Sequence, residues 1–333
     1  MLQEGTIDLN QRDHVGRTTL HVAIFTRAAD IACDLIDAGA RITARLADGR
    51  APLHLAAQYD LAAVIEKLLE KNKKNVEEAE KKKKADEDGD DKMEDAPERP
   101  SSEDDWSSQD EEDIEMSDAD DEDDEDEEDD EDESSEDEAG NKQKKLEEKP
   151  AETGEIPEEE EDQPDIIEID AYDWDLGFSA FSYAVLFGSI PTLEVLIAGE
   201  ADPKLATNPS PGHLPLHPLT LTILRDDEDE ACKIAERLLQ IPSVTSSTAN
   251  QNMVTILHAA VSSGRTKLVE TLLRCDKNAS SVINFPSMEW NAVIFPVVTA
   301  IHKKHYAILG TMLAHGAKLN LDEEDITRAL EAA

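Results

Sequence analysis

The chain has 333 residues, with 32 Lys and Arg against 78 Asp and Glu, and its formal net charge is −46. This length allows one large domain or two smaller ones. Met1 to Asp8 has neither the basic start nor the apolar core of a signal peptide, and no stretch reaches the roughly 18 apolar residues of a membrane span. Three scattered cysteines (Cys33, Cys232 and Cys275) are too few for a disulfide framework. We therefore expect a soluble, intracellular protein.

Two segments near the N terminus share one pattern at a spacing of 33 residues. Gly16-Arg-Thr-Thr-Leu-His-Val-Ala matches Gly49-Arg-Ala-Pro-Leu-His-Leu-Ala, and Leu35-Ile36 matches Leu68-Leu69 at the same offset. The glycine permits the positive φ of a tight turn, and the Thr18 hydroxyl suits the start of a short helix. Each segment therefore predicts an inner helix followed by an outer helix.

A long acidic segment interrupts the pattern. Between Asn72 and Asp165 there are 47 acidic and 12 basic residues, a net charge of −35, which leaves 31 acidic and 20 basic residues, or −11, elsewhere. Aromatic and β-branched residues almost vanish there, and the run from Asp120 to Glu133 is wholly acidic. Such a segment buries too little apolar surface to offset its conformational entropy, so we expect residues 72–165 to be disordered.

The pattern returns after this insert. Three further segments repeat the spacing between the first leucine of the pattern and its later apolar pair. They are Phe181 to Ile197, Leu257 to Leu273 and Pro296 to Ala317, and the third segment matches the pattern less well. An irregular unit from Pro203 to Gln240 has a spacing about four residues too long. Glu323 to Glu331 predicts a short capping helix with a polar outer face.

The period of 33 and the Thr-Pro-Leu-His-like core resemble the ankyrin repeat. The resemblance implies an all-α solenoid of about six helix-turn-helix units, interrupted by the acidic insert. It divides the chain into a first block at 1–71, the insert at 72–165 and a second block at 166–333. Because two repeats alone are too few for stability, we expect the blocks to stack on each other. Residues 7–10 resemble the end of a preceding repeat; a start on a half-repeat and a shortened gene product both remain open.

At a finer level the pattern is similar to the ankyrin regions of filamentous-fungal proteins, in which two clean repeats precede an acidic insert. Tyr172-Asp-Trp-Asp and the stretch from Ile283 to Trp290 support this resemblance. Some such relatives continue into a poly(ADP-ribose) polymerase module. No residues of this sequence match that module, so no catalytic role is carried over.

Three histidines, His21, His54 and His258, occupy equivalent repeat positions. The resemblance implies that each bonds the backbone of the neighbouring hairpin, and we expect this role in place of metal ligation. The sequence shows no zinc-like pairing of histidine with cysteine, no Ser/His/Asp arrangement, no phosphate-binding glycine loop and no paired catalytic carboxylates. We therefore expect no enzyme activity, no cofactor and no metal.

The resemblance places the binding surface on the hairpin tips and the exposed face of the inner helices. The positions in the first three repeats are His14, Val15, Arg17, Phe25 and Thr26, then Ala47, Asp48, Arg50, Gln58 and Tyr59, then Asp175, Leu176, Phe178, Leu186 and Phe187. From these the predicted partner-binding set is His14, Arg17, Phe25, Arg50, Gln58, Tyr59, Phe178 and Phe187. Aromatic residues and arginine favour binding hot spots, and Phe25, Tyr59 and Phe187 would form an aromatic stripe. The alternative is that these rings pack between repeats.

Two features of the insert carry their own hypotheses. Lys71 to Lys84 is either a nuclear import signal or a helical extension in which Glu77, Glu78 and Glu80 pair with lysines four residues later, and both readings can hold at once. Acids lie three residues after several serines, a context that acidophilic kinases prefer and in which phosphates would add negative charge. These serines are Ser101, Ser102, Ser107, Ser108, Ser117, Ser134 and Ser135.

The predicted function is a non-enzymatic scaffold that binds a protein partner in its groove, while the acidic tract attracts basic ligands such as histones. A second hypothesis is an acidic histone or chromatin factor, in which Asp104-Asp105-Trp106 supplies a rare apolar anchor. A third is the regulatory region of an ADP-ribosyltransferase-related protein. We expect the nucleus more than the cytoplasm, and no membrane or direct nucleic-acid binding.

Overall fold

The structure of the protein is a computed structural model that describes residues 8–90, 163–289 and 292–319, with the side chains of residues 83–90, 289 and 292 left out. Residues 1–85 and 152–333 form one unit, and residues 86–151 a second. The acid run, the serines of the insert and the predicted capping helix at Glu323 to Glu331 lie outside the described residues.

Four helices form the first part of the chain, and their starts follow from the sequence. They are α1 (Thr19–Phe25), α2 (Ala29–Asp37), α3 (Pro52–Gln58) and α4 (Ala62–Asp90). As predicted, the Thr18 hydroxyl accepts a hydrogen bond from the His21 amide at the start of α1. Gly16 and Gly49 adopt φ values of +81° and +82° in the turns, a backbone conformation that is strained for residues other than glycine.

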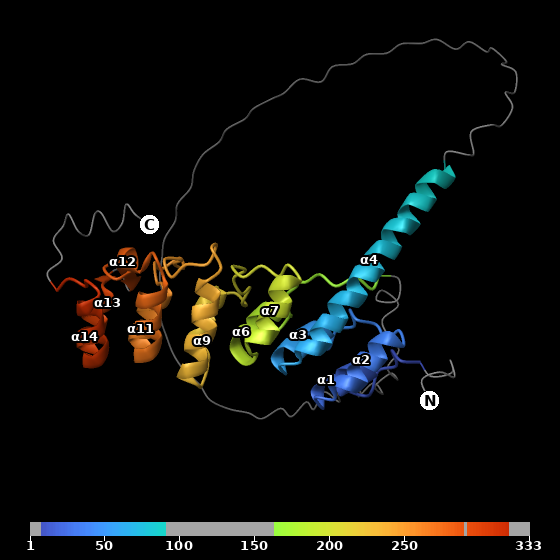
Figure 1. The fold of residues 1–333 in the computed structure, drawn as a ribbon, viewed down its shortest axis with the longest axis horizontal. Helices are drawn as coiled ribbons and strands as arrows, with labels where there is room; N and C mark the ends of the chain where they lie inside the picture. Colours follow the sequence, from blue (N-terminus) through green and yellow to red (C-terminus); the bar gives the residue numbers. More distant parts are fainter. Residues whose placement is uncertain (1–7, 91–162, 290–291, 320–333) are drawn as a thin grey trace, which may run out of the picture. The chain divides into compact units, whose positions relative to one another are not determined.

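The second block continues the same alternation of inner and outer helices (Figure 1). Its inner helices start at an N-terminal cap or at a proline, which suits the first turn because it lacks an amide hydrogen. The elements are α6 (Ala180–Phe187), α7 (Ile190–Ala198), α8 (Pro218–Leu221), the 3-10 helix η1 (Thr222–Leu224), α9 (Glu228–Leu239), α10 (Ile256–Ser263), α11 (Thr266–Cys275), α12 (Ala279–Val282), β1 (Ser287–Glu289), β2 (Ala292–Ile294), α13 (Pro296–His302) and α14 (Tyr306–Ala314).

The helices pack into two layers that share one apolar core. Inner helices contact each other in the order α1, α3, α6, α8, and α10 contacts α13, while the outer helices α7, α9, α11 and α14 contact in turn. The repeat leucine and its equivalents are at most 2% exposed, and burying each such side chain contributes about 1.5–3 kcal/mol. These residues are Leu20, Leu53, Phe181, Leu257 and Val297.

Helices α3 and α6 pack against each other although the insert separates them in sequence. The two blocks therefore stack as adjacent repeats, as expected from the instability of two repeats alone. At this junction Asp60 caps helix α7, since its Oδ1 accepts from the Ser189 amide at 2.8 Å and the Thr192 hydroxyl at 2.5 Å. The turn of one repeat thus supplies a cap for the next repeat's outer helix.

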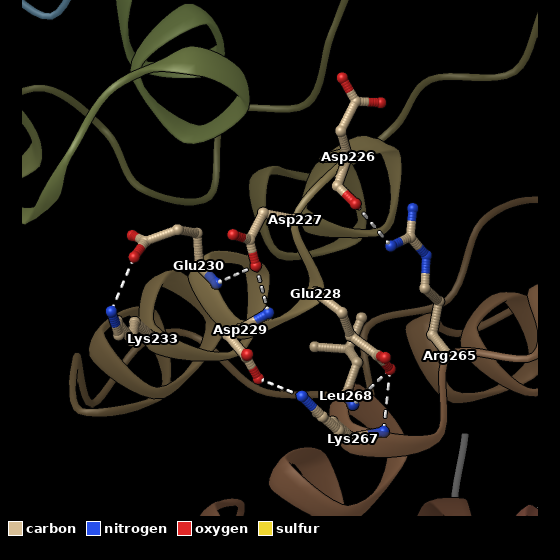
Figure 2. A network of polar contacts seen from close by, with 9 residues as sticks. All are labelled: Asp226, Asp227, Glu228, Asp229, Glu230, Lys233, Arg265, Lys267 and Leu268. Atoms are coloured by element: carbon tan, nitrogen blue, oxygen red, sulfur yellow. Dashed lines mark hydrogen bonds and ion pairs between the residues drawn. The ribbon is translucent and has the colours of Figure 1, made fainter.

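Repeats four and five are joined by the same device (Figure 2). Glu228 at the start of α9 accepts from the amides of Lys267 and Leu268 at 2.8 and 3.3 Å, at the start of α11. The Lys267 ammonium also lies 2.6 Å from Asp229. Neither α7 nor α11 has a side-chain cap from its own N-cap residue, so both helices depend on the preceding repeat.

Helix α4 has 29 residues, whereas the outer helices α2 and α7 have nine each (Figure 1). The predicted helical extension of repeat two is therefore present, and the disorder expected from Asn72 onward is wrong for residues 72–90, which continue α4. Lys81 lies 3.9 Å from Glu77 as predicted. Among the described side chains, Glu78 and Lys82 form no ion pair. Lys84 lies among the side chains left out.

The expectation of an all-α chain needs a small correction. Strands β1 and β2 pair antiparallel, with Ser287 opposite Ile294. They lie in the long connection between α12 and α13, where the two extended segments satisfy each other's backbone groups. The long spacing of the fourth unit has a similar cause: its hairpin carries extra residues between Thr207 and Leu216, which are joined by a 2.9 Å backbone hydrogen bond.

Candidate partner-binding groove

A pocket of about 210 Å³ lies between the second and third repeats, on the side of the hairpin tips and inner helices. It brings together four of the eight predicted partner-binding residues, Arg50, Gln58, Phe178 and Phe187. The remaining lining residues are Asp48, Asp173, Asp175, Leu176 and Tyr183.

On the second repeat, Arg50 is held in place by two neighbours. Its guanidinium lies 2.6 Å from Asp48 and donates to the Gln58 side-chain oxygen at 2.7 Å. Burial alone would raise the pKa of Asp48, but the hydrogen bonds from Arg50 outweigh it and lower that pKa. Burial likewise opposes the charge of Arg50, and Asp48 reverses the effect and raises the Arg50 pKa. The pair stays ionised and fixes the geometry of this wall.

The predicted aromatic stripe forms only in part. The rings of Phe25 and Tyr59 meet edge to face with centroids 5.7 Å apart, and the Arg27 guanidinium lies 5.5 Å above the Tyr59 ring. Both rings are half-buried and pack against the core, as the alternative interpretation predicted. Phe187 is 53% exposed and stacks on Tyr183 at 6.3 Å. The stripe is therefore a pair between repeats one and two and a separate exposed ring on repeat three.

The first hairpin places its predicted residues apart from the pocket. His14 and Val15 are exposed at the tip, whereas Arg17 is half-buried and lies 2.8 Å from Asp13. Hydrogen bonds from the Arg17 backbone and side chain lower the pKa of Asp13 to about 2. Arg17 therefore stabilises its own hairpin, as Arg50 does in the second.

Asp173 lies beneath the pocket and is 4% exposed. Its carboxylate accepts hydrogen bonds from the amides of Leu176 and Phe178, at 2.9 and 3.2 Å, and from the Tyr183 hydroxyl at 2.5 Å. Burial first, and then the bond to Asp173, raises the pKa of Tyr183 far above its usual range. Tyr183 therefore remains a neutral donor that holds Asp173 in place.

The three repeat histidines are buried and neutral. In His21 and His258 the Nδ1 atom lies 2.9 Å from the hydroxyl of Thr18 or Thr255. His54 Nε2 lies 2.9 Å from the Ala171 carbonyl, the predicted bond to the neighbouring hairpin. Burial lowers the pKa of each histidine to about 4.

The predicted hydrogen bond from the repeat histidine to the neighbouring hairpin is not present at all three positions. The Nε2 atoms of His21 and His258 have no hydrogen-bond partner of normal geometry within the described part of the chain. The carbonyls of Ala44 and Phe285 are still close enough to raise the pKa of these two histidines slightly against the larger effect of burial.

A series of side-chain hydrogen bonds links successive hairpins and was not predicted from the sequence. Arg12 donates to the carbonyls of Gly16 and Arg45, and Arg45 in turn donates to those of Gly49 and Tyr172, at 2.6–2.9 Å. Tyr172 continues the series with a 2.9 Å bond from its hydroxyl to the Ala206 carbonyl. The 33-residue spacing of Arg12 and Arg45 was a visible signal, but the replacement of arginine by tyrosine across the insert was not.

Within the described residues, no helix has the length and apolar character needed to cross a membrane. The same residues contain no group of three or more histidine, cysteine, aspartate or glutamate side chains arranged to hold a metal ion.

Comparison with known proteins matches two segments, residues 48–81 and 252–282, to the ankyrin repeat family model. The ankyrin repeat domain of human ASB11 is 14% identical and has a TM-score of 0.52, with 93% of this chain and 89% of that chain covered. The ankyrin repeat domain of Bcl-3, described as a unique member of the IkappaB protein family, is 16% identical with a TM-score of 0.49 and the same coverage. Curated protein sequences gave no match. The chain thus contains ankyrin repeats and has a helical ankyrin-repeat fold.

Proposed function

We propose that this chain is a protein-interaction module that binds a partner protein across the hairpin tips and inner helices of repeats two and three. Ankyrin repeats are units of protein recognition, and their folds are typically non-enzymatic. The observation that supports this location is the 210 Å³ pocket, because it combines fixed polar groups with exposed apolar side chains.

The exposed apolar groups sit at the rim of the pocket. Leu176 is 47% exposed and Phe187 is 53% exposed, beside the immobilised guanidinium of Arg50. An aromatic ring and an ordered arginine around a pocket form the kind of centre that dominates binding energies, since little side-chain entropy is lost on association. Tyr59 supports this surface from between the repeats instead of offering a free face.

The test compares two double variants of the full-length chain by proximity labelling in its native cell. Leu176→Ser with Phe187→Ala removes the apolar rim, while Tyr306→Ala with Leu313→Ser removes similarly exposed groups from the outer helix α14. We expect the groove variant to lose labelling of its partners at least tenfold and the α14 variant to keep it. Equal labelling by both variants would show that the groove is not the interface. Circular dichroism establishes that both variants are folded.

We further propose that the acidic tract attracts the same partner at long range. Its support is the sequence charge of −35 between Asn72 and Asp165. Charge attraction of this kind raises association rates and is screened beyond about 8 Å at physiological salt. Replacing the acids of Asp120 to Glu133 by Asn and Gln should slow association and flatten its salt dependence, with little change in dissociation. If instead the tract variant loses the partner and the groove variant retains it, the second hypothesis, an acidic histone or chromatin factor, is favoured.

A further inference from the structure

Four hairpins of the array share one backbone bond, which defines equivalent positions. In each, an amide donates to a carbonyl four or five residues later, at 2.9–3.1 Å. The donor and acceptor residues are Asp13 and Arg17, Leu46 and Arg50, Asp173 and Phe178, and Asn250 and Val254. Arg17, Arg50, Phe178 and Val254 therefore occupy the same position, three residues before the buried anchor of each inner helix.

Charge at this position is balanced in three of these hairpins. Arg17 and Arg50 each form an ion pair with an aspartate of their own hairpin, at 2.8 and 2.6 Å. The fifth repeat carries neither charge, because Asn250 replaces the acid, and its neutral Oδ1 accepts from the Val254 amide at 3.0 Å. The third repeat differs: Asp173 occupies the position of Asp13 in the first hairpin, while Phe178 occupies the position of Arg17 and Arg50.

Asp173 consequently holds a buried charge without a cation. Its three hydrogen bonds come from two amides and the Tyr183 hydroxyl, all neutral donors. Within the described residues no lysine, arginine or histidine forms an ion pair with it. Arg50 also lines the pocket, but its guanidinium is already paired with Asp48 and Gln58. Buried carboxylates are usually paired, so the third hairpin has an unbalanced negative charge beneath an open pocket.

Aromatic rings surround the same space. The ring centroids of Phe178 and Tyr183 are 5.6 Å apart, and those of Tyr183 and Phe187 are 6.3 Å apart. Ring faces attract cations, and Asp175 adds a further exposed carboxylate at the rim. Rings and carboxylates together favour a cation that carries an apolar stem, which describes an arginine or lysine side chain.

We propose that this pocket receives a basic side chain of the partner protein, which supplies in trans the cation that Arg17 and Arg50 supply within their own hairpins. This inference rests on the proposed function and specifies the chemistry of the partner at one subsite. The partner is then a protein with an arginine or lysine at the centre of its contact surface.

The experiment uses two small probes that differ only in charge, N-butylguanidinium and the neutral N-butylurea, titrated into the full-length protein and followed by NMR. We expect guanidinium to shift the amide signals of residues 173–187 and to bind about tenfold more tightly than the urea. Two variants should abolish this preference: Asp173→Asn, which removes the charge as Asn250 does in repeat five, and Phe178→Arg, which restores the cation in cis. Phe178→Leu is the matched control and should retain a preference for the cation.

Equal binding of the two probes, or a preference that survives in Asp173→Asn, would overturn the assignment. The preference is measured without any partner, so it is independent of the labelling result for the groove variant. A partner that needs Leu176 and Phe187 while the probes bind equally would leave the groove as the interface and remove only the basic subsite.

Discussion

Asn72 and Ile167 exchange two hydrogen bonds although 95 residues separate them. The Asn72 side-chain oxygen accepts from the Ile167 amide at 2.7 Å, and its amide group donates to the Ile167 carbonyl at 3.3 Å. Nearby, Asn75 donates to the Asp165 carbonyl at 2.5 Å, and the Asp165 carboxylate accepts from the amides of Ile42 and Thr43 at 3.0 Å. These contacts hold both ends of the segment predicted as the insert against the array, so we expect the two blocks to align without residues 91–162.

We therefore expect the array to fold without residues 91–162. A Gly/Ser linker of about 20 residues has the reach, roughly 25 Å, to return from the end of α4, which extends about 22 Å beyond Asn75. Helical circular dichroism and the melting temperature should stay nearly unchanged. Loss of cooperative unfolding in the linker variant would show that the insert is structural. The same deletion combined with Asn72→Ala should lower stability by about 1–2 kcal/mol, since two hydrogen bonds are lost.

Leu53 is 2% exposed between the second repeat and its neighbours. Leu53→Ala should lower the free energy of unfolding by about 2–5 kcal/mol, because it removes buried methyl groups and leaves a cavity. Leu313→Ala is the control, since Leu313 is 40% exposed, and should cost less than about 1 kcal/mol. Urea unfolding followed by circular dichroism measures both. Similar losses in the two variants would contradict the repeat alignment.

Substitutions at Gly177 and Gly212 distinguish the cost of backbone strain from the cost of a steric clash. Both have positive φ, +65° and +95°, but a Cβ on Gly177 would lie 1.8 Å from the Asn208 carbonyl oxygen, whereas one on Gly212 meets nothing within 4 Å. Gly212→Ala should therefore lower stability by about 1–2 kcal/mol, the cost of the left-handed conformation. Gly177→Ala should cost clearly more, because the hairpin of the fourth unit must move. Thermal unfolding of the two variants tests this prediction. Equal losses of stability would mean that the hairpin of the fourth unit moves aside without cost.

Acid should weaken the array before the carboxylates titrate. Burial holds the pKa of His21, His54 and His258 near 4 in the folded protein, against 6.5 when unfolded. The unfolded chain then binds more protons, so this stability is complete above pH 6.5 and is lost as the pH falls towards 4. Between pH 7 and pH 5 each histidine should contribute a loss of about 2 kcal/mol. Urea unfolding at both pH values measures the loss, and His54→Gln should reduce it by about one third.

The repeat itself was predictable from the sequence. A spacing of 33 residues, with Gly16 and Gly49 in turns and Leu20 and Leu53 as anchors, identified the helix pairs because each of these residues satisfies a local requirement of backbone conformation or burial. The degraded copies followed from the same spacings. Boundaries were less well defined, since helix α4 continues to Asp90 through residues that the composition assigned to the insert.

Only the tertiary structure decided how charges and rings are paired. The sequence placed Phe25, Tyr59 and Phe187 in one row, yet the distances show that Tyr59 pairs with Phe25 while Phe187 pairs with Tyr183. Asp173 gave no signal of its own in a chain with 78 acids, because its unusual property is that no cation among the described residues forms an ion pair with it. Local conformational propensity and burial can be predicted from the order of residues along the chain. The balance of charge at a buried site depends on residues that only folding brings together.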